Sequence, residues 1–589
     1  MKEEIKKIFK GEVEDGEKVL DQYSHDASIF EVRPELVLFP KDSEDVKNLV
    51  KWVNQNKEKY PNLSITPRCA GTCMSGGPLG ESLILDFTRH MNKLISFSAE
   101  RSPRSDLFEF PRSDLGHEIT VQPGMFYRDF EKITLEKNLI LPCYTASKNI
   151  NAMGGMFGNN SAGERSLKYG QTQDYVLESK IVFADGEEYL VKSFNQDELK
   201  EKIKNNFEGQ IYKNIFELIK NNQEEIKNAK PKVSKNSAGY YIWNVTRSPR
   251  SDLFEFPRSD LGHSKNFIFD LNKILVGSQG TLGIVTEITF KLLPKPKYDR
   301  LVAVFINDLE PLGRIVDEIL ELKPDMLETY DDQTMRLAVK YFRDFLKNKN
   351  LIQKIKFLWN FLPEFKMARN NNFPKLVLLV SFAGNNKSMV NDLCFKLKEK
   401  IKDFKTHIHI TKSDAEENKY WDIRRGSFNL LWKHVIGNHT APFIDDIIVA
   451  PRFLPKFLPE LRQILNKYDL TYTLAGHAGN GNFHIIPLMD FSRPDTGKII
   501  LELSEQVFDL VSRYHGSMAG EHNDGLIRTP FLNKMYSPKV IEIFSEIKKI
   551  FDPKNIFNPG KKIPALNPFE SKKYILSHLV SEHDVKHNI

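Results

Sequence analysis

Near the start of the chain, short apolar runs alternate with an amphipathic segment. Residues 36–40 and 82–86 are apolar runs of the length of buried strands. Between them, residues 45–54 repeat their apolar side chains at intervals of three and four, which predicts a helix with one buried face. Further short strand patterns occur at residues 119–121, 180–184 and 284–290. This alternation of strand and helix patterns predicts a first domain of α+β or α/β type that ends near residue 294.

After about residue 300 the pattern changes. Charged amphipathic segments at 311–322 and 389–403 predict helices, and the apolar run at 376–380 predicts a strand between them. We therefore expect a second domain, followed by a turn-rich segment and a polar, mobile tail. With an N-terminal helical segment in front, the predicted divisions are residues 1–34, 35–295, 296–545, 546–562 and 563–589.

One sequence occurs twice without change, at residues 101–117 and 247–263. Structural repeats drift in sequence while they keep their apolar pattern, whereas these copies are identical and stand in different contexts. We interpret both as mobile insertions at loop tips, where a longer loop adds little closure entropy. The alternative is a docking motif that the chain uses twice.

Composition and charge exclude several classes of protein. The chain has 84 basic and 78 acidic residues, mixed along its length, which gives little support to a nucleic-acid partner. Its first residues lead into no apolar segment of signal-peptide type, and it contains no run of about 18 apolar residues, so we expect a cytoplasmic protein, at most peripheral to the inner face of the membrane. The four cysteines form no CxxC pair, and the absence of any after Cys394 leaves the chain without ligands for iron–sulfur clusters of its own.

The most informative segment contains His477 and His484, separated by a glycine-rich turn. Glycines allow the strand to fold back and bring the two imidazoles together. Glu521 completes a three-ligand metal set with an open position for a substrate oxygen, and His522 lies beside it as a base. Zn suits this set, while Mn and Fe remain open.

Three segments rich in small residues lie upstream, at 67–77, 154–163 and 277–285. Backbone N–H groups in such loops can converge on a pyrophosphate without interference from side chains. The first loop follows neither the GxGxxG nor the P-loop spacing, which disfavours a nucleoside triphosphate. Together the three loops would line a long, narrow ligand.

These loops, the two histidines, the Glu521-His522 pair and the closing Asn-Pro-Gly-Lys at 558–561 stand in a family's order. The chain resembles the FAD-linked oxidases with a flavin domain of the vanillyl-alcohol-oxidase or PCMH type, and within them the D-lactate and D-2-hydroxyglutarate dehydrogenase branch. The resemblance implies an α+β fold: a two-lobed FAD-binding domain, a ferredoxin-like α+β substrate domain, and a C-terminal segment that returns to close on FAD.

The resemblance also implies the residues that hold FAD. They are Arg68, Ala70, Gly71, Thr72, Ser75, Gly76, Gly77, Pro142, Ser147, Gly154, Gly155, Asn160, Ser161, Gly163, Gly280, Gly283, Ile284 and Asn558. Some relatives attach FAD covalently through a histidine in the first loop. Thr72 stands at that place here, so we expect FAD that is bound without a covalent link.

For the chemistry, the resemblance implies that His477, His484 and Glu521 bind a divalent metal and that His522 is the base. The metal would polarise the hydroxyl group of a 2-hydroxy acid while His522 takes its proton, and the α-hydrogen would leave as hydride to the flavin. Arg424 would hold the substrate carboxylate, a role that suits a planar guanidinium. Asn482 would orient a ligand or contact substrate; a turn-capping asparagine is the alternative.

Some positions depart from the pattern or receive no chemical role. Phe428 stands where relatives that use hydroxyglutarate carry a hydroxyl residue, although Arg528 could compensate. Arg425 is expected to be a solvated helix residue. Residues 443–449 resemble a strand at the domain junction, and its two aspartates, 445 and 446, are assigned no chemistry.

The sequence therefore predicts a FAD-dependent oxidoreductase that converts a D-2-hydroxy acid, D-lactate or a near relative, to the 2-oxo acid. One alternative is a D-2-hydroxyglutarate dehydrogenase. Another is a flavoprotein subunit of a larger glycolate or lactate oxidase complex that needs a separate iron–sulfur partner. Electrons would leave FAD through a quinone, a cytochrome or such a subunit.

Overall fold

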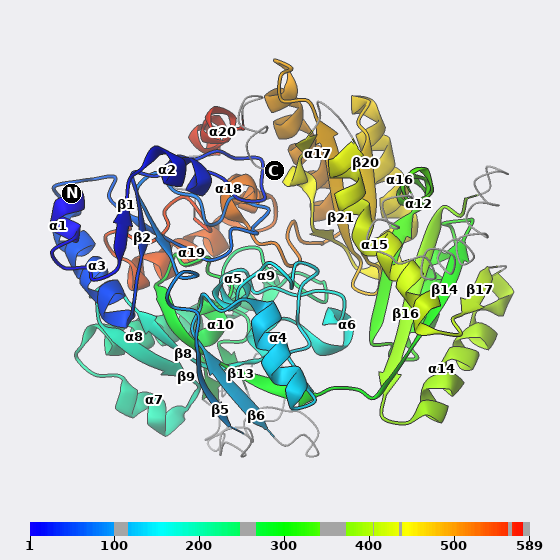
Figure 1. Ribbon diagram of the computed structural model, residues 1–589, viewed down its shortest axis with the longest axis horizontal. Coiled ribbons are helices and arrows are strands. Elements are labelled where there is room, and N and C mark those ends of the chain that lie inside the picture. Colours follow the sequence, from blue (N-terminus) through cyan, green and yellow to red (C-terminus); the bar gives the residue numbers. More distant parts are fainter. Residues whose placement is uncertain are drawn as a thin grey trace.

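The computed structural model describes residues 1–98, 116–247, 267–341, 373–404, 406–434, 439–563 and 568–580, with the backbone alone at 427–434 and 568. Two bodies lie side by side, the first built from the N-terminal half and the C-terminal end of the chain, the second from the region between (Figure 1). Helices and sheets mix in both bodies, so the predicted α+β class is confirmed. No helix in these ranges is both long and apolar enough to cross a bilayer.

The first domain contains two main sheets. One has the order β1-β2-β4-β3, in which parallel strands β2 (Leu36–Phe39), β4 (Leu83–Asp86) and β3 (Ile65–Arg68) are flanked by antiparallel β1 (Glu12–Glu14). Helix α3 (Ser43–Asn56) buries Val46, Leu49, Val50 and Val53, the face that its apolar spacing predicts. This face joins a core shared by both sheets, because the same cluster contains Leu38 and Leu85 of one and Val182 of the other.

The other main sheet is antiparallel, with the order β5-β6-β13-β8-β9. Its strands are β5 (Leu94–Ser98), β6 (His117–Val121), β13 (Ile284–Pro294), β8 (Val176–Val182) and β9 (Glu188–Lys192), and β7 (Leu139–Ile140) pairs with β13. A small sheet, β10 (Phe194–Asn195), β12 (Ile268–Phe269) and β11 (Thr246–Arg247), lies in the same domain.

Both identical copies connect paired antiparallel strands. The copy at 101–117 lies between β5 and β6, where Ser98 stands opposite Glu118. The copy at 247–263 lies between β11 and β12, where Arg247 stands opposite Ile268. Apart from their ends at 116–117 and Arg247, the copies fall outside the described residues.

The second domain is built on an eight-stranded antiparallel sheet of order β17-β14-β16-β15-β20-β21-β18, with β19 paired to β21. The strands are β17 (His407–Ile410), β14 (Tyr298–Ile306), β16 (Leu376–Gly384), β15 (Met326–Asp331), β20 (Tyr472–His477), β21 (Asn482–Met489), β18 (His439–Thr440) and β19 (Ile447–Ile448).

Alternation along these strands separates two cores. Val302 and Val304 of β14 belong to a core shared with α11 (Leu312–Leu320), α14 (Lys387–Lys400), α16 (Leu454–Leu465) and α17 (Thr496–Arg513). Leu301 and Ala303 belong to the core on the opposite face, shared with α12 (Asp332–Lys340) and α15 (Asp414–His434). Ala475 of β20 lies in this second core, so the α12–α15 face is also the face of the predicted metal site.

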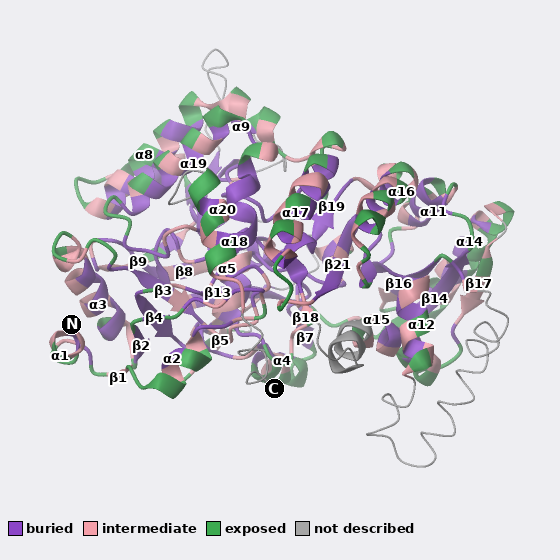
Figure 2. Ribbon diagram, turned by 90° about the horizontal axis from the view of Figure 1, so that it is seen from above, coloured by how far each residue is buried: buried purple, intermediate pink, exposed green. Residues whose placement is uncertain are grey.

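Towards its C-terminus the chain returns to the first domain. Helix α18 (Gly525–Arg528) begins where the Leu526 amide donates to the carbonyl of Ser75 at 2.7 Å. Helix α19 (Pro538–Phe551) packs against α8 (Phe207–Asn221) and α9 (Gln223–Ala229), as Figure 2 shows. The return thus starts upstream of residue 546.

Three local expectations are corrected by the structure. The tail contains helix α20 (Pro568–Ser577), because Ile575 is buried and the chain beyond it pairs with residues 29–31 through the bridge between Phe30 and Leu579. The loop predicted at 154–163 begins as helix α5 (Met153–Asn159), with Asn160 in the left-handed region at its end. The strand predicted at 443–449 is a 3-10 turn, η5 (Pro442–Ile444), followed by the two-residue β19.

Candidate active site

The two predicted metal-binding histidines lie on one hairpin. His477 ends β20 and His484 follows the start of β21, and their Nε2 atoms are 3.3 Å apart. The turn between the strands requires glycine, because Gly481 has a φ of 71° and a Cβ there would lie 1.8 Å from the carbonyl oxygen of Val449. The glycine-rich turn thus brings the imidazoles together, as the sequence predicts.

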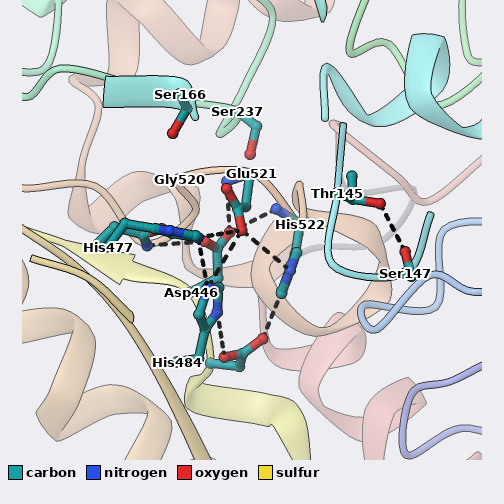
Figure 3. Close-up of polar contacts among 12 residues, drawn as sticks. Thr145, Ser147, Ser166, Ser237, Asp446, His477, His484, Gly520, Glu521 and His522 are labelled. Atoms are coloured by element: carbon teal, nitrogen blue, oxygen red, sulfur yellow. Dashed lines mark hydrogen bonds and ion pairs between the residues drawn. The ribbon is translucent and has the colours of Figure 1, made fainter. Parts of the chain in front are cut away.

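Glu521 reaches the same point from the loop before α18. Its Oε1 lies 3.1 Å from Nε2 of His477 and 3.3 Å from Nε2 of His484 (Figure 3). Ligands of a tetrahedral ion with bonds of about 2.1 Å are separated by roughly 3.4 Å, so these three donors have the spacing of a metal site. Because these donor atoms converge at one buried point, the residues fit a divalent ion.

Each imidazole of the site has a buried carboxylate on its other nitrogen. Glu328 of β15 contacts Nδ1 of His477 at 2.5 Å, and Asp445 contacts Nδ1 of His484 at 3.1 Å and Nδ1 of His522 at 2.6 Å. These contacts orient the Nε2 atoms of His477 and His484 towards Glu521. The sequence assigned Asp445 no role, whereas the fold brings it against two imidazoles that lie far away in the sequence.

The second aspartate holds the backbone of the site. Asp446, in the left-handed region at φ 66°, accepts from the amides of Glu521 at 2.8 Å and His522 at 2.6 Å. Asn482 donates to Asp446 at 3.0 Å and to the carbonyl of Ile447 at 3.1 Å. Asn482 is fully buried and does not line the cavity. It orients Asp446, which in turn holds the backbone of Glu521 and His522.

Arg528 has a similar supporting position. It is fully buried and donates to the carbonyl of Asn523 at 2.9 Å and to that of Asp445 at 2.7 Å. It does not line the cavity, so the expectation that it could bind a second substrate carboxylate is not supported by its placement. Sequence spacing could not show this, because burial of an arginine depends on distant packing.

Charges in the site oppose the effect of burial. Burial lowers the pKa of His522, but the carboxylates of Asp445 and Asp446 outweigh this effect and raise it. Burial would raise the pKa of Asp445, whereas the facing imidazoles of His522 and His484 lower it further than burial raises it. A raised pKa makes His522 a stronger proton acceptor once it is neutral.

A buried lysine from the first domain also reaches Glu521, one of the three candidate metal ligands. Lys235 is 3% exposed, and its Nζ lies 2.5 Å from Oε2 of Glu521. Burial would raise the pKa of Glu521, but Lys235 and then His477 hold it well below the usual range. Sequence reasoning missed this residue, since a lone lysine carries no pattern.

A cavity of about 760 Å³ joins this site to the first domain. Twelve of the residues predicted to hold the cofactor line it, namely Arg68, Ala70, Gly71, Thr72, Gly77, Ser147, Gly154, Gly155, Ser161, Gly163, Gly280 and Gly283. The same cavity contains His477, His484, Glu521 and His522. Thr145 and Ser147, whose hydroxyl oxygens are 2.9 Å apart, form part of its wall (Figure 3).

The other predicted cofactor residues lie behind the wall: Ser75, Gly76, Pro142, Asn160, Ile284 and Asn558. Asn558, for example, donates to the carbonyls of Gly77 at 2.9 Å and Gln279 at 2.7 Å, so it ties two loops together. Ile284 points into the core because neighbouring residues of a strand alternate between faces. Gln22, His25, Asp26 and Ala27, which carried no sequence signal, also line the cavity.

The glycine wall fits a large planar or extended ligand. A Cβ at Gly155 would meet no atom within 4 Å, so this backbone faces open cavity. By contrast, a Cβ at Gly280 would lie 2.2 Å from Pro67, which shows how closely the first and third loops pack. The volume is within the roughly 300–1,000 Å³ of cofactor and ligand pockets.

Two adjacent arginines of α15 line the cavity differently. Arg424 lies 3.2 Å from Oε2 of Glu328, the carboxylate that also contacts His477. Arg425 makes two hydrogen bonds to Glu164 of the first domain, at 2.7 and 2.6 Å. The side chain of Arg425 is half exposed, as expected for a solvated helix residue, although its paired carboxylate comes from a distant loop. The side chain of Phe428 lies outside the described residues.

Two family models match the chain. Residues 34–191 match the FAD binding domain, and residues 295–562 match the C-terminal domain of FAD linked oxidases. The two matches cover the glycine loops up to residue 191 and the whole histidine–glutamate site.

Individual relatives are more distant. The chain is 25% identical to D-2-hydroxyglutarate dehydrogenase of Haemophilus influenzae, over 95% of this chain and 51% of that protein. It is 23% identical to D-lactate dehydrogenase of Anaerostipes hadrus, over 95% and 96%. The 4-ethylphenol oxidase from Gulosibacter chungangensis has the same fold, with a TM-score of 0.62 at 14% identity over 94% of each chain. The chain spans about half the length of the D-2-hydroxyglutarate dehydrogenases that it matches.

Proposed function

Because the chain belongs to the FAD-linked oxidases, we propose that it oxidises a 2-hydroxy acid to the 2-oxo acid, with FAD as the acceptor of the hydride. The observation that carries this proposal is that one cavity is lined by the glycine loops of the FAD binding domain, by the three metal-type ligands, by His522 and by Arg424. The relatives named for D-lactate and D-2-hydroxyglutarate agree with this class of substrate.

The protein's own residues would act on the acid as follows. Arg424 holds the carboxylate, and Glu328 keeps the guanidinium next to His477. His522 takes the hydroxyl proton at Nε2, since its Nδ1 is engaged by Asp445. With the acid held in this way, its α-hydrogen can face the glycine loops that would hold the cofactor.

We propose FAD bound without a covalent link, since Thr72 lines the cavity and residues 67–77 contain no histidine. His477, His484 and Glu521 would hold a divalent ion, with Zn the best fit to the ligand set and Mn and Fe as alternatives. Such an ion supplies Lewis-acid stabilisation of developing negative charge on the substrate oxygen. A quinone, a cytochrome or an iron–sulfur partner would be the final electron acceptor.

The test is anaerobic reduction of the bound flavin by a panel of D- and L-2-hydroxy acids, with and without a chelator. We expect one enantiomer of the acid to bleach the flavin. A chelator should abolish this bleaching, and added metal should restore it. If no 2-hydroxy acid bleaches a protein that is fully loaded with FAD and metal, the proposed function is wrong.

A further inference from the structure

One face of the β20–β21 hairpin extends the cavity beyond the histidines. Thr473 and Ala475 on β20 and Ile486 on β21 line the cavity together with His477 and His484. The register places Thr473 opposite Ile486 and Ala475 opposite His484. Because residues two apart on a strand share a face, all five side chains stand on the same side of the sheet.

We call Thr473, Ala475 and Ile486 the floor of the cavity. The floor begins at Ala475 and Ile486, which are two residues along their strands from His477 and His484. Neighbours on the same face of a strand are about 7 Å apart, which is the length of a short carbon chain. An acid with its hydroxyl group at the metal-type ligands and its carboxylate at Arg424 can extend its remaining carbons over Ala475 and Ile486. Both are largely buried, at 4% and 7% exposed, so carbons placed there leave water.

The described cations around the cavity already face acidic or carbonyl groups. Arg425 is held by Glu164 at 2.7 and 2.6 Å, and Glu164 itself lines the cavity. Lys235 is held by Glu521, and Arg68 donates to the carbonyls of Tyr23 at 3.2 Å and His25 at 2.6 Å. A second substrate carboxylate over this floor would lose its water next to apolar carbon.

We propose that Thr473, Ala475 and Ile486 form the subsite for the substrate side chain, and that it selects 2-hydroxy monocarboxylic acids with a short apolar side chain over dicarboxylic acids. This inference rests on the proposed function and adds the class of acid. Ala475 and Ile486 bury the carbons, and Thr473 closes the far end of the floor.

The wild-type test compares single-turnover flavin reduction by lactate, 2-hydroxybutyrate and 2-hydroxyvalerate with reduction by 2-hydroxyglutarate. The ratio of the limiting rate to the apparent dissociation constant is expected to favour the best monoacid by at least about tenfold, the scale on which an unpaired buried polar group discriminates. Faster or tighter use of 2-hydroxyglutarate would overturn this inference and leave the proposed function intact. If none of these acids reduces the flavin, both this inference and the proposed function are wrong.

The variant test adds a cation to the floor. Ile486→Lys is expected to shift the preference towards 2-hydroxyglutarate by at least about tenfold, because the new ammonium group can pair with the distal carboxylate. Ile486→Leu is the matched control and should keep the order of the wild type. FAD content reports folding; if Ile486→Lys does not load FAD, Thr473→Lys places the charge on the opposite strand. An unchanged preference in a FAD-loaded lysine variant would contradict the proposal.

Discussion

The Oδ2 atom of Asp445 lies 2.6 Å from Nδ1 of His522, the proposed base. The other oxygen of the same carboxylate contacts Nδ1 of His484 at 3.1 Å. One buried side chain therefore orients a metal-type ligand and the base together. A change at Asp445 therefore affects the orientation of both His484 and His522.

Replacing Asp445 by asparagine should disturb both imidazoles. Asp445→Asn keeps the size of the side chain but leaves one oxygen for two Nδ1 atoms, so flavin reduction should slow by about 10- to 100-fold, the usual cost of losing such a support. Stopped-flow reduction and metal titration measure the two effects. Asp197→Asn, a matched change on an exposed side chain, should alter neither. Normal rates and normal metal affinity in Asp445→Asn would contradict this account.

Glu328 contacts both Arg424, the proposed ligand of the substrate carboxylate, and His477, a proposed metal ligand. Glu328→Gln should weaken metal binding by about 10- to 100-fold and also raise KM, because His477 and Arg424 lose the same carboxylate. Metal affinity measured by titration of the FAD-loaded protein separates this role from a general loss of activity. Glu321→Gln, on an exposed side chain, is the control. A change in KM alone would remove the link to His477.

His522 should be needed for chemistry and not for binding of the cofactor. His522→Gln is expected to slow flavin reduction by about 100- to 10,000-fold, the contribution of a positioned general base. The FAD content and the visible spectrum should stay as in the wild type, since the glycine loops are unchanged. Reduction at the normal rate would assign proton removal to another group.

The stability of the protein should depend on pH through the buried carboxyl group of Asp331. Burial raises its pKa to about 6, above the value of about 3.9 in an unfolded chain. Its ionised form therefore destabilises the fold as pH rises from about 4 to 6, by up to about 3 kcal/mol. Asp331→Asn retains an oxygen for the Thr334 amide at the start of α12, so its melting temperature should exceed that of the wild type above pH 6. The difference should vanish near pH 4; a gap that is constant with pH would refute the assignment.

The two identical copies should be dispensable. Each connects strands that already pair antiparallel, with Ser98 opposite Glu118 and Arg247 opposite Ile268. Short turns in place of both copies should leave FAD content and flavin reduction within about twofold, because loop length changes closure entropy only slowly. Loss of FAD would show that the copies support the cofactor.

Local patterns predicted much of the fold. The apolar spacing in α3 and the apolar runs of β2, β4 and β16 correspond to elements of the structure, because burial of one face or of a whole short run leaves a direct trace in the sequence. The pattern failed where long-range pairing decides, as in α20, whose following residues bind to residues 29–31. The glycine-rich residues 154–163 were predicted as a loop for another reason: helix α5 contains Gly154, which packs closely against Pro123, and Gly155, which faces the open cavity.

The sequence by itself determined that His477 and His484 face each other, since a glycine-rich turn closes one hairpin between them. It also indicated Glu521, His522 and Arg424, whose residue types match the chemistry. Only the tertiary structure decided what supports them. Glu328, Asp445 and Lys235 come from a distant strand, a tight turn and the other domain, and they meet the site only when the sheet register and the packing of the two domains are in place. The hydrogen-bond partners of a buried imidazole depend on how distant segments pack together. Such long-range packing leaves no periodic pattern of residues in the local sequence.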